Sequence, residues 1–352
     1  MKPVNIKFGG IEAGRGLAAL AVVMHHAGNN LAEPRFYDTV VLGGHLGNFN
    51  VGVDFFFVLS GFIIAWIHQE DIGRPSRLKR YALRRILRIY PPYWLILLPL
   101  SALYFLTPGS GKQSQHEVTN LLFSLTLLPY TSPPIIGAAW TLVHEVLFYF
   151  IFGFLIVLGR RAIWILPVWA IMILLLQLDA PLTFPWSVLF NAFNLEFLIG
   201  VAGALFVKVH NIPYPRAVAF AGGVAFIGFM LFATSIQDQT LIARMAFGLS
   251  ALAALLGLVQ IEKDGQLAVP KPLLFLGSAS YAIYLIHGFA LSIALHLTTR
   301  LLPKGIPPLA ILFLVVTFAV LIGCLFHYFV ERPVAVSLRS IAAHESRKPA
   351  PV

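Results

Sequence analysis

Long apolar stretches recur along the whole sequence, and this feature restricts the fold more than any other. A helix that crosses the hydrocarbon core of a bilayer needs about 20 predominantly apolar residues. Only 11% of the 352 residues are charged and 58% are hydrophobic, whereas soluble domains carry about 25% charged residues. We therefore expect an all-α polytopic membrane protein with about ten transmembrane helices. The stretches are 11–28, 49–67, 93–106, 136–158, 162–178, 186–207, 217–236, 241–261, 273–298 and 306–329.

Three segments need separate treatment. The stretch 93–106 is short, and its helix can begin earlier as an interfacial segment before the sequence YPPYW at 90–94. The apolar stretch 120–130 is too short to span and predicts an additional interfacial or re-entrant segment. The last residues, HESRKPAPV, are polar, and we expect residues 336–352 to form a disordered cytoplasmic tail after a membrane domain formed by residues 1–335.

The distribution of Lys and Arg predicts the orientation. Ten spans place both termini on one side, and with the N-terminus inside, the inner segments hold 19 of the 25 basic residues. Cytoplasmic loops carry an excess of Lys and Arg, so both termini are predicted to be cytoplasmic. The net charge of +10 then reflects topology and not a nucleic-acid partner. The outer segments hold five basic residues, namely Arg35, Lys112, Arg244, Arg300 and Lys304.

The first apolar stretch contains three ionisable residues, Arg15, His25 and His26. Such groups are costly inside a membrane and usually functional. Arg15 and His26 are eleven residues apart, so they share a helix face about 16 Å apart along the axis, whereas His25 is turned about 100° away. This spacing predicts that Arg15 and His26 line one internal channel.

Four ionisable groups on four different stretches come out at a similar depth in the outer half of the membrane: His26, Asp54, Glu145 and His287. A histidine that acts as a base, or that carries an acyl group, needs a carboxylate to orient it, and either acidic residue can serve. Two alternatives stay open at this point. The polar groups can serve helix packing, or they can form the proton relay of a transporter. The absence of an internal repeat speaks against a transporter.

Seven basic residues crowd into positions 74–88. Arg77, Arg80, Arg84 and Arg88 share one helical face with Arg85 beside it, and Pro91 and Pro92 are expected to break or kink the helix. Plain anchoring at the cytoplasmic surface is one interpretation. Five of the six basic residues in 77–88 are Arg, and guanidinium groups match phosphate geometry. A cytosolic polyphosphorylated ligand such as coenzyme A fits this pattern.

Six motifs occur in the order seen in the acyltransferase-3 family, which the chain resembles over about residues 10–335. They are GRGLAALAVVMHH, VGVDFFFVLSGFII, LRRILRIYPPYW, AAWTLVHEVLFYF, SYAIYLIHGF and YFVERP. The family consists of integral-membrane acyltransferases that modify bacterial surface polysaccharides and related glycans. This chain is most similar to its exopolysaccharide-modifying members.

The resemblance implies roles for particular residues. The catalytic set would be His26, Arg15 and Glu145, to which the depth argument adds Asp54. The residues that bind the acyl-CoA donor would be Arg84, Arg85, Arg88, Tyr281 and Tyr284. The residues that bind the acceptor would be Trp140, Thr141, Ser280 and His287. We also expect Glu12, where the family often has Asp, to pair with Arg15 three residues later.

The resemblance also implies an activity. We expect an O-acyltransferase of the bacterial inner membrane that moves an acetyl group from cytosolic acetyl-CoA to a hydroxyl of an extracytoplasmic or lipid-linked saccharide. No metal is expected. The partners would be acyl-CoA, a saccharide acceptor, membrane lipid and polysaccharide-assembly proteins. Two alternatives remain: an acyltransferase for a small secreted molecule, such as a lipochitooligosaccharide or macrolide, and a proton-coupled transporter.

Overall fold

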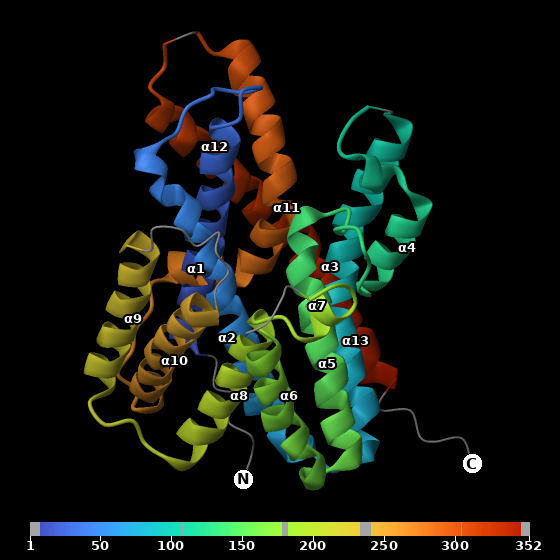
Figure 1. The fold of residues 1–352 in the computed structure, drawn as a ribbon, viewed down its shortest axis with the longest axis vertical. Coiled ribbons are helices and arrows are strands. Elements are labelled where there is room, and N and C mark those ends of the chain that lie inside the picture. Colours follow the sequence, from blue (N-terminus) through green and yellow to red (C-terminus); the bar gives the residue numbers. More distant parts are fainter. Residues whose placement is uncertain (1–7, 108, 178–181, 233–240, 304, 346–352) are drawn as a thin grey trace.

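The computed structural model describes residues 8–107, 109–177, 182–232, 241–303 and 305–345. Within these ranges the chain is helical and contains no β-strand, which confirms the predicted fold class (Figure 1). The α-helices are α1 (Gly9–Leu31), α2 (Gly52–His68), α3 (Leu78–Leu106), α4 (Val118–Thr126), α5 (Trp140–Leu158), α6 (Ile165–Leu176), α7 (Trp186–Leu189), α8 (Phe193–Val209), α9 (Pro215–Phe232), α10 (Leu241–Lys263), α11 (Lys271–Leu301), α12 (Pro308–Phe326) and α13 (Arg332–Glu345).

Eight helical segments of the described chain are long and apolar enough to cross a membrane. The predicted count of about ten is therefore not confirmed. The helices α1 and α6, predicted as the spans 11–28 and 162–178, are not among the eight. Helix α6 has only 12 residues. Helix α1 contains the polar residues Glu12, Arg15, His25 and His26, and it packs against α2, α11 and α12 inside the bundle.

Helix α3 runs from Leu78 to Leu106 with Pro91 and Pro92 inside it, so the predicted break does not occur. Membrane helices tolerate proline when neighbouring groups satisfy the freed backbone atoms. The aromatic residues of the YPPYW sequence instead hold the short helix α4. Tyr90 and Tyr93 donate hydrogen bonds to the carbonyl oxygens of Thr126 (2.8 Å) and Ser124 (2.9 Å). These carbonyls belong to the last turn of α4, where intrahelical partners are missing.

The predicted tail is partly helical. Helix α13 begins at Arg332 and ends at Glu345, so residues 336–345 are not the irregular segment that polar composition suggested. The helix packs against α3 and follows the π-helical turn His327–Glu331. The residues of α13 are therefore helical and packed against α3, although the polar composition favoured an irregular tail. The remaining predicted tail residues, 346–352, lie outside the described residues.

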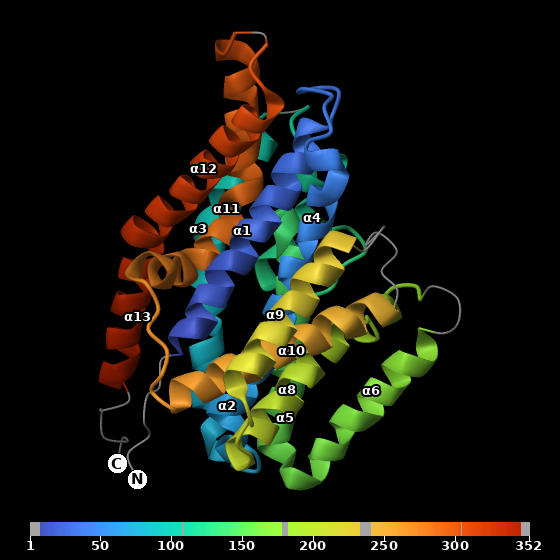
Figure 2. The same ribbon diagram turned by 90° about the vertical axis from the view of Figure 1, so that its left-hand side faces the viewer.

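The helices pack as a bundle around α1 and α2. Helices α9 and α10 form a pair on one flank, and α3, α5 and α13 lie on the opposite flank (Figure 1). Helix α6 lies at the edge of the molecule (Figure 2). The two helix pairs with the most extensive contact that include α1 or α2 are α1 with α11 and α2 with α8. Both rely on glycine at the crossing point, as is common where membrane helices approach closely.

Gly277 of α11 brings the α1 and α11 backbones together. A Cβ atom added at Gly277 would lie 1.9 Å from the carbonyl oxygen of Glu12, well inside van der Waals contact. A Cβ at Gly61 of α2 would meet the carbonyl oxygen of Phe197 of α8 at the same distance. The α1–α11 contact sets the register that brings Arg15 and His26 beside residues of α11.

Gly277→Ala is expected to destabilise the protein by about 3 kcal/mol, the upper end of the usual cost of overpacking, because the clash is with backbone. Gly288→Ala on the same helix is the matched control. An added Cβ at Gly288 meets no atom within 4 Å, so this variant should be neutral or gain about 0.5–1 kcal/mol from helix propensity. Thermal unfolding in detergent measures both. Equal stability of the two variants would contradict the close α1–α11 contact.

Candidate functional site

A central cavity lies between helices α1, α2, α3, α5, α8 and α11. The cavity brings together seven residues that the sequence predicted for the site, namely Arg15, Arg88, Thr141, Glu145, Ser280, Tyr281 and Tyr284. The rest of its wall is largely apolar, with Val53, Phe56, Phe57, Leu59, Ile63, Leu142 and Phe197.

Two arginines give the cavity positive charge. Arg15 lies 3.6 Å from Glu12, which confirms the expected ion pair. Arg88 is exposed along the cavity and has no hydrogen-bond or ion-pair partner among the described residues. The Oγ atom of Ser280 also lacks a hydrogen-bond partner there, although the residue is fully buried. Arg88 and Ser280 can therefore bind an anionic or polar ligand without first breaking a contact.

Glu145 is held in the cavity wall by a hydrogen bond from the hydroxyl of Tyr149, one helical turn further along α5. Tyr149 is fixed in turn, because Tyr81 of α3 donates to its backbone carbonyl over 3.0 Å. The guanidinium carbon of Arg85 lies 5.5 Å from the centre of the Tyr149 ring. These contacts tie the carboxylate to the N-terminal part of α3.

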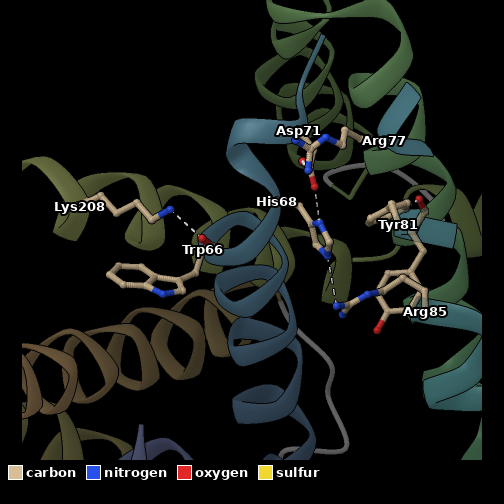
Figure 3. Close-up of polar contacts among 8 residues, drawn as sticks. Trp66, His68, Asp71, Arg77, Tyr81, Arg85 and Lys208 are labelled. Carbon is tan, nitrogen blue, oxygen red and sulfur yellow. Dashed lines mark hydrogen bonds and ion pairs between the residues drawn. The ribbon is translucent and has the colours of Figure 1, made fainter. Parts of the chain in front are cut away.

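Arg85 itself belongs to a buried network (Figure 3). The Nδ1–H of His68 donates to Asp71 over 2.8 Å, and Arg85 Nη2 donates to His68 Nε2 over 3.3 Å. Arg85 is only 8% exposed. Of the three arginines predicted to bind the donor, Arg88 lines the central cavity, Arg85 is occupied by His68, and Arg84 is exposed outside the cavity wall.

His26 and His287 form a pair, with ring centres 4.9 Å apart. His287 is buried, and its Nδ1 lies 2.6 Å from the carbonyl oxygen of Tyr284. A carbonyl only accepts, so Nδ1 carries the proton and Nε2 carries the lone pair. Neither ring nitrogen of His26 has a hydrogen-bond partner within the described ranges, which leaves this half-buried imidazole available for chemistry.

His25 differs from its neighbour because both of its ring nitrogens are occupied. Nδ1 donates to the carbonyl oxygen of Leu46 over 3.2 Å, and the amide of Asn29 donates to Nε2 over 3.1 Å. His25 thus has the contacts of a packing residue.

Tyr284 links the histidine pair to the central cavity. Its side chain lines the cavity, and its hydroxyl lies 3.0 Å from Thr141 Oγ1. Its backbone carbonyl accepts from His287. Arg15 lines this cavity, whereas His26 and His287 are not part of its wall, so the structure does not show the predicted common channel of Arg15 and His26.

Asp54 does not orient His26. It is fully buried and forms an ion pair with Arg244 of α10. Arg244 was assigned to an outer segment from the sequence, yet it is only 2% exposed and its guanidinium lies 4.4 Å from the centre of the Phe193 ring. Glu196 of α8 is also fully buried and close enough to Asp54 for electrostatic interaction. The sequence contained a feature that could have revealed this cluster, because Glu196 and Arg244 are charged residues inside the apolar stretches 186–207 and 241–261.

Trp140, predicted to bind the acceptor, lies in a different place from Thr141. It lines a second cavity together with His144, a histidine that sequence analysis did not select. Across the described residues, no group of three or more His, Cys, Asp or Glu side chains is arranged to hold a metal ion.

Comparison with known proteins gives a consistent result. A profile of the acyltransferase domain matches residues 8–328. The exopolysaccharide production protein ExoZ of Rhizobium meliloti (strain 1021) is 30% identical over 320 residues, which cover 85% of this chain and 93% of ExoZ. No solved structure matches the chain.

Two relatives are longer. The putative peptidoglycan O-acetyltransferase YrhL of Bacillus subtilis (strain 168) is 25% identical, and the peptidoglycan O-acetyltransferase OatA of Listeria monocytogenes serovar 1/2a is 27% identical. Each match covers 92% of this chain. The chain spans only 54% of YrhL and 55% of OatA.

Proposed function

Because this chain belongs to the acyltransferase-3 family, we propose that it transfers an acetyl group from cytosolic acetyl-CoA to a hydroxyl of an extracytoplasmic or lipid-linked saccharide. The observation that carries the proposal is the central cavity, where two arginines and a carboxylate lie next to the Tyr284–His287–His26 chain. The arginines can bind an anionic donor, and the histidines can act as a base. A membrane protein that holds both groups close together is suited to transferring an acyl group between the two sides of the membrane.

The donor binds with its phosphates on the basic side of the cavity. Arg88 supplies an unpaired guanidinium there, and Arg84 lies one turn before it on α3. Arginine forms paired, charge-assisted hydrogen bonds with phosphate. The resemblance assigns donor binding to Arg85 as well, and the contacts of Arg85 with His68 and Tyr149 support a role in holding α3 near Glu145.

His26 acts as the general base. It takes the proton from the acceptor hydroxyl while the hydroxyl oxygen attacks the thioester carbonyl carbon. The C–O bond forms, the C–S bond breaks, and the proton on His26 is available to the departing thiolate of coenzyme A. The neutral His287, with its Nε2 lone pair, is a neighbour that can stabilise the protonated ring. A transient acyl group on His26 is the alternative route.

The names of the relatives indicate the class of acceptor. ExoZ is named for exopolysaccharide production, and YrhL and OatA are named for peptidoglycan O-acetylation. We therefore propose the bacterial inner membrane as the location and polysaccharide-assembly proteins as partners. The distribution of Lys and Arg supports cytoplasmic termini. A small secreted acceptor would use the same site. Family membership favours acyl transfer over proton-coupled transport.

The proposal is tested with purified protein, labelled acetyl-CoA and mass spectrometry of extracellular glycans from cells with and without the gene. Label should appear as an ester on the glycan, and the ester should be missing without the gene. Label found only on a small secreted molecule would reassign the acceptor. Absence of any transfer, with acetyl-CoA intact, would reject the activity.

Orientation is tested by cysteine labelling in intact cells that carry Cys324→Ser. We expect Ser76→Cys, in the exposed basic segment before α3, to resist an impermeant thiol reagent. We expect His45→Cys, in the exposed segment between α1 and α2, to react. The opposite pattern would invert the topology.

A further inference from the structure

A second cavity, with about 720 Å³ of empty space, lies beside the first turns of α5. It is formed by α4, the segment that follows α4, α5, and Val188 of α7. Helix α5 lines both cavities, because Thr141 and Glu145 lie along the central one, whereas Trp140 and His144 lie along the second. The spacing of four residues within each pair gives α5 two adjacent functional faces.

The orientation of His144 is fixed by Asn194 of α8. The amide nitrogen of Asn194 donates to the carbonyl oxygens of Val188 (2.9 Å) and Leu189 (3.0 Å), so its Oδ1 must be the atom 3.0 Å from His144 Nδ1. That oxygen only accepts, and Nδ1 therefore carries the proton. The Nε2 atom is left with a lone pair and has no partner among the described residues. His144 is 5% exposed and lines the cavity.

Aromatic rings form much of the remaining wall. The rings of Phe123 and Tyr130 are stacked with centres 4.5 Å apart. The indole of Trp140 meets His144 edge to face at 5.9 Å, and its N–H has no partner in the described part of the chain. The cavity thus combines apolar ring surfaces with the N–H donor of Trp140 and the Nε2 acceptor of His144. A sugar ring has the complementary chemistry, with C–H faces and hydroxyl groups.

The composition of the wall argues against other ligands. No Lys or Arg lies among its described lining residues, so the phosphates of coenzyme A would find no countercharge. Its hydroxyl-bearing residues, Ser124, Tyr130, Thr131 and Ser132, suit a polar ligand better than an acyl chain. A wholly apolar occupant would also leave the His144 lone pair buried and unpaired, which is costly.

We infer that the second cavity binds a saccharide unit of the acceptor next to the unit that receives the acyl group. This inference rests on the proposed function. His144 Nε2 accepts a hydrogen bond from a sugar hydroxyl, Asn194 is the positioning residue that fixes the imidazole, and Trp140 provides a stacking face. Trp140 adjoins Thr141, whose hydroxyl contacts Tyr284, so the bound saccharide lies beside the chain of residues that leads to His26.

The test uses oligosaccharides released from the cell's own surface glycan after alkaline de-O-acetylation. His144→Phe keeps the ring and removes the acceptor, and Trp140→Phe keeps an aromatic face and removes the donor. Each should raise the KM for the oligosaccharide about tenfold, the effect of one hydrogen bond, and leave the KM for acetyl-CoA unchanged. His296→Phe is the matched control, because His296 is exposed on α11 and outside both cavities.

A second variant and a second readout keep the test decisive. Tyr130→Leu removes a ring from the cavity wall without touching Asn194, and saturation-transfer NMR reports oligosaccharide binding without catalysis. Loss of binding in the cavity variants but not in the control supports the saccharide site, even if wild-type protein transfers no acetyl group. Active transfer with an unchanged oligosaccharide KM in all three cavity variants would overturn the inference while leaving the proposed function intact.

Discussion

Replacing His26 with alanine is expected to lower acyl transfer by at least about 10²–10⁴-fold, the usual contribution of a general base, and by more if the imidazole also carries the acyl group. Expression and acyl-CoA binding should stay near wild type. The reason is geometric: His26 has no hydrogen-bond partner among the described residues, stands 4.9 Å from the ring of His287, and lies outside the wall that contains Arg88.

His25→Ala is the matched control on the same helix. Both nitrogens of His25 bond to neighbouring residues, so this variant should lose some stability and little activity. The measurement is transfer of labelled acetyl from acetyl-CoA at equal amounts of folded protein. An inactive His25→Ala protein beside an active His26→Ala protein would show that the wrong histidine has been assigned.

The second large effect is expected at Arg88. Arg88→Ala should weaken acetyl-CoA binding by about 1.5–3 kcal/mol for each charge-assisted phosphate bond that is lost, which corresponds to roughly 10–150-fold in Kd. Arg88 lines the central cavity and has no partner to replace within the described residues. Isothermal titration with acetyl-CoA in detergent measures the change.

Arg160→Ala provides the control for this experiment. Arg160 is exposed in the short basic turn between α5 and α6, on the proposed cytoplasmic side, and it does not line the central cavity. A plain anchoring role for the basic residues would make the two variants equal. Equal affinities for acetyl-CoA would thus remove the argument for a donor site on α3.

Properties that arise within one helix could be predicted well from the sequence. The apolar stretches gave the all-helical membrane class, and the spacing of Glu12 and Arg15 gave their ion pair. That ion pair depends on helical geometry alone. Sequence analysis also assigned Ser280, Tyr281 and Tyr284 to the site, and all three line the central cavity.

Contacts between distant helices could not be predicted in the same way. Asp54 and Glu145 were predicted to lie at similar depths, but depth does not reveal that Asp54 turns toward Arg244 and Glu145 toward the cavity. Arg85 shares its motif with Arg88, yet His68 of α2 takes it out of the cavity wall. The role of His144 became visible only with Asn194, fifty residues away on α8. Such pairings depend on which helices pack together, and a single sequence does not specify that.

The account rests on transfer of an acyl group between the two sides of the membrane, and reconstituted vesicles of one orientation test this directly. Labelled acetyl-CoA is supplied only at the face that carries Ser76, and de-O-acetylated oligosaccharide only at the face that carries His45. We predict that wild-type protein forms labelled oligosaccharide ester across the bilayer and that the His26→Ala protein does not. Ester formed only when donor and acceptor share one face, or formed equally by the His26→Ala protein, would contradict the account.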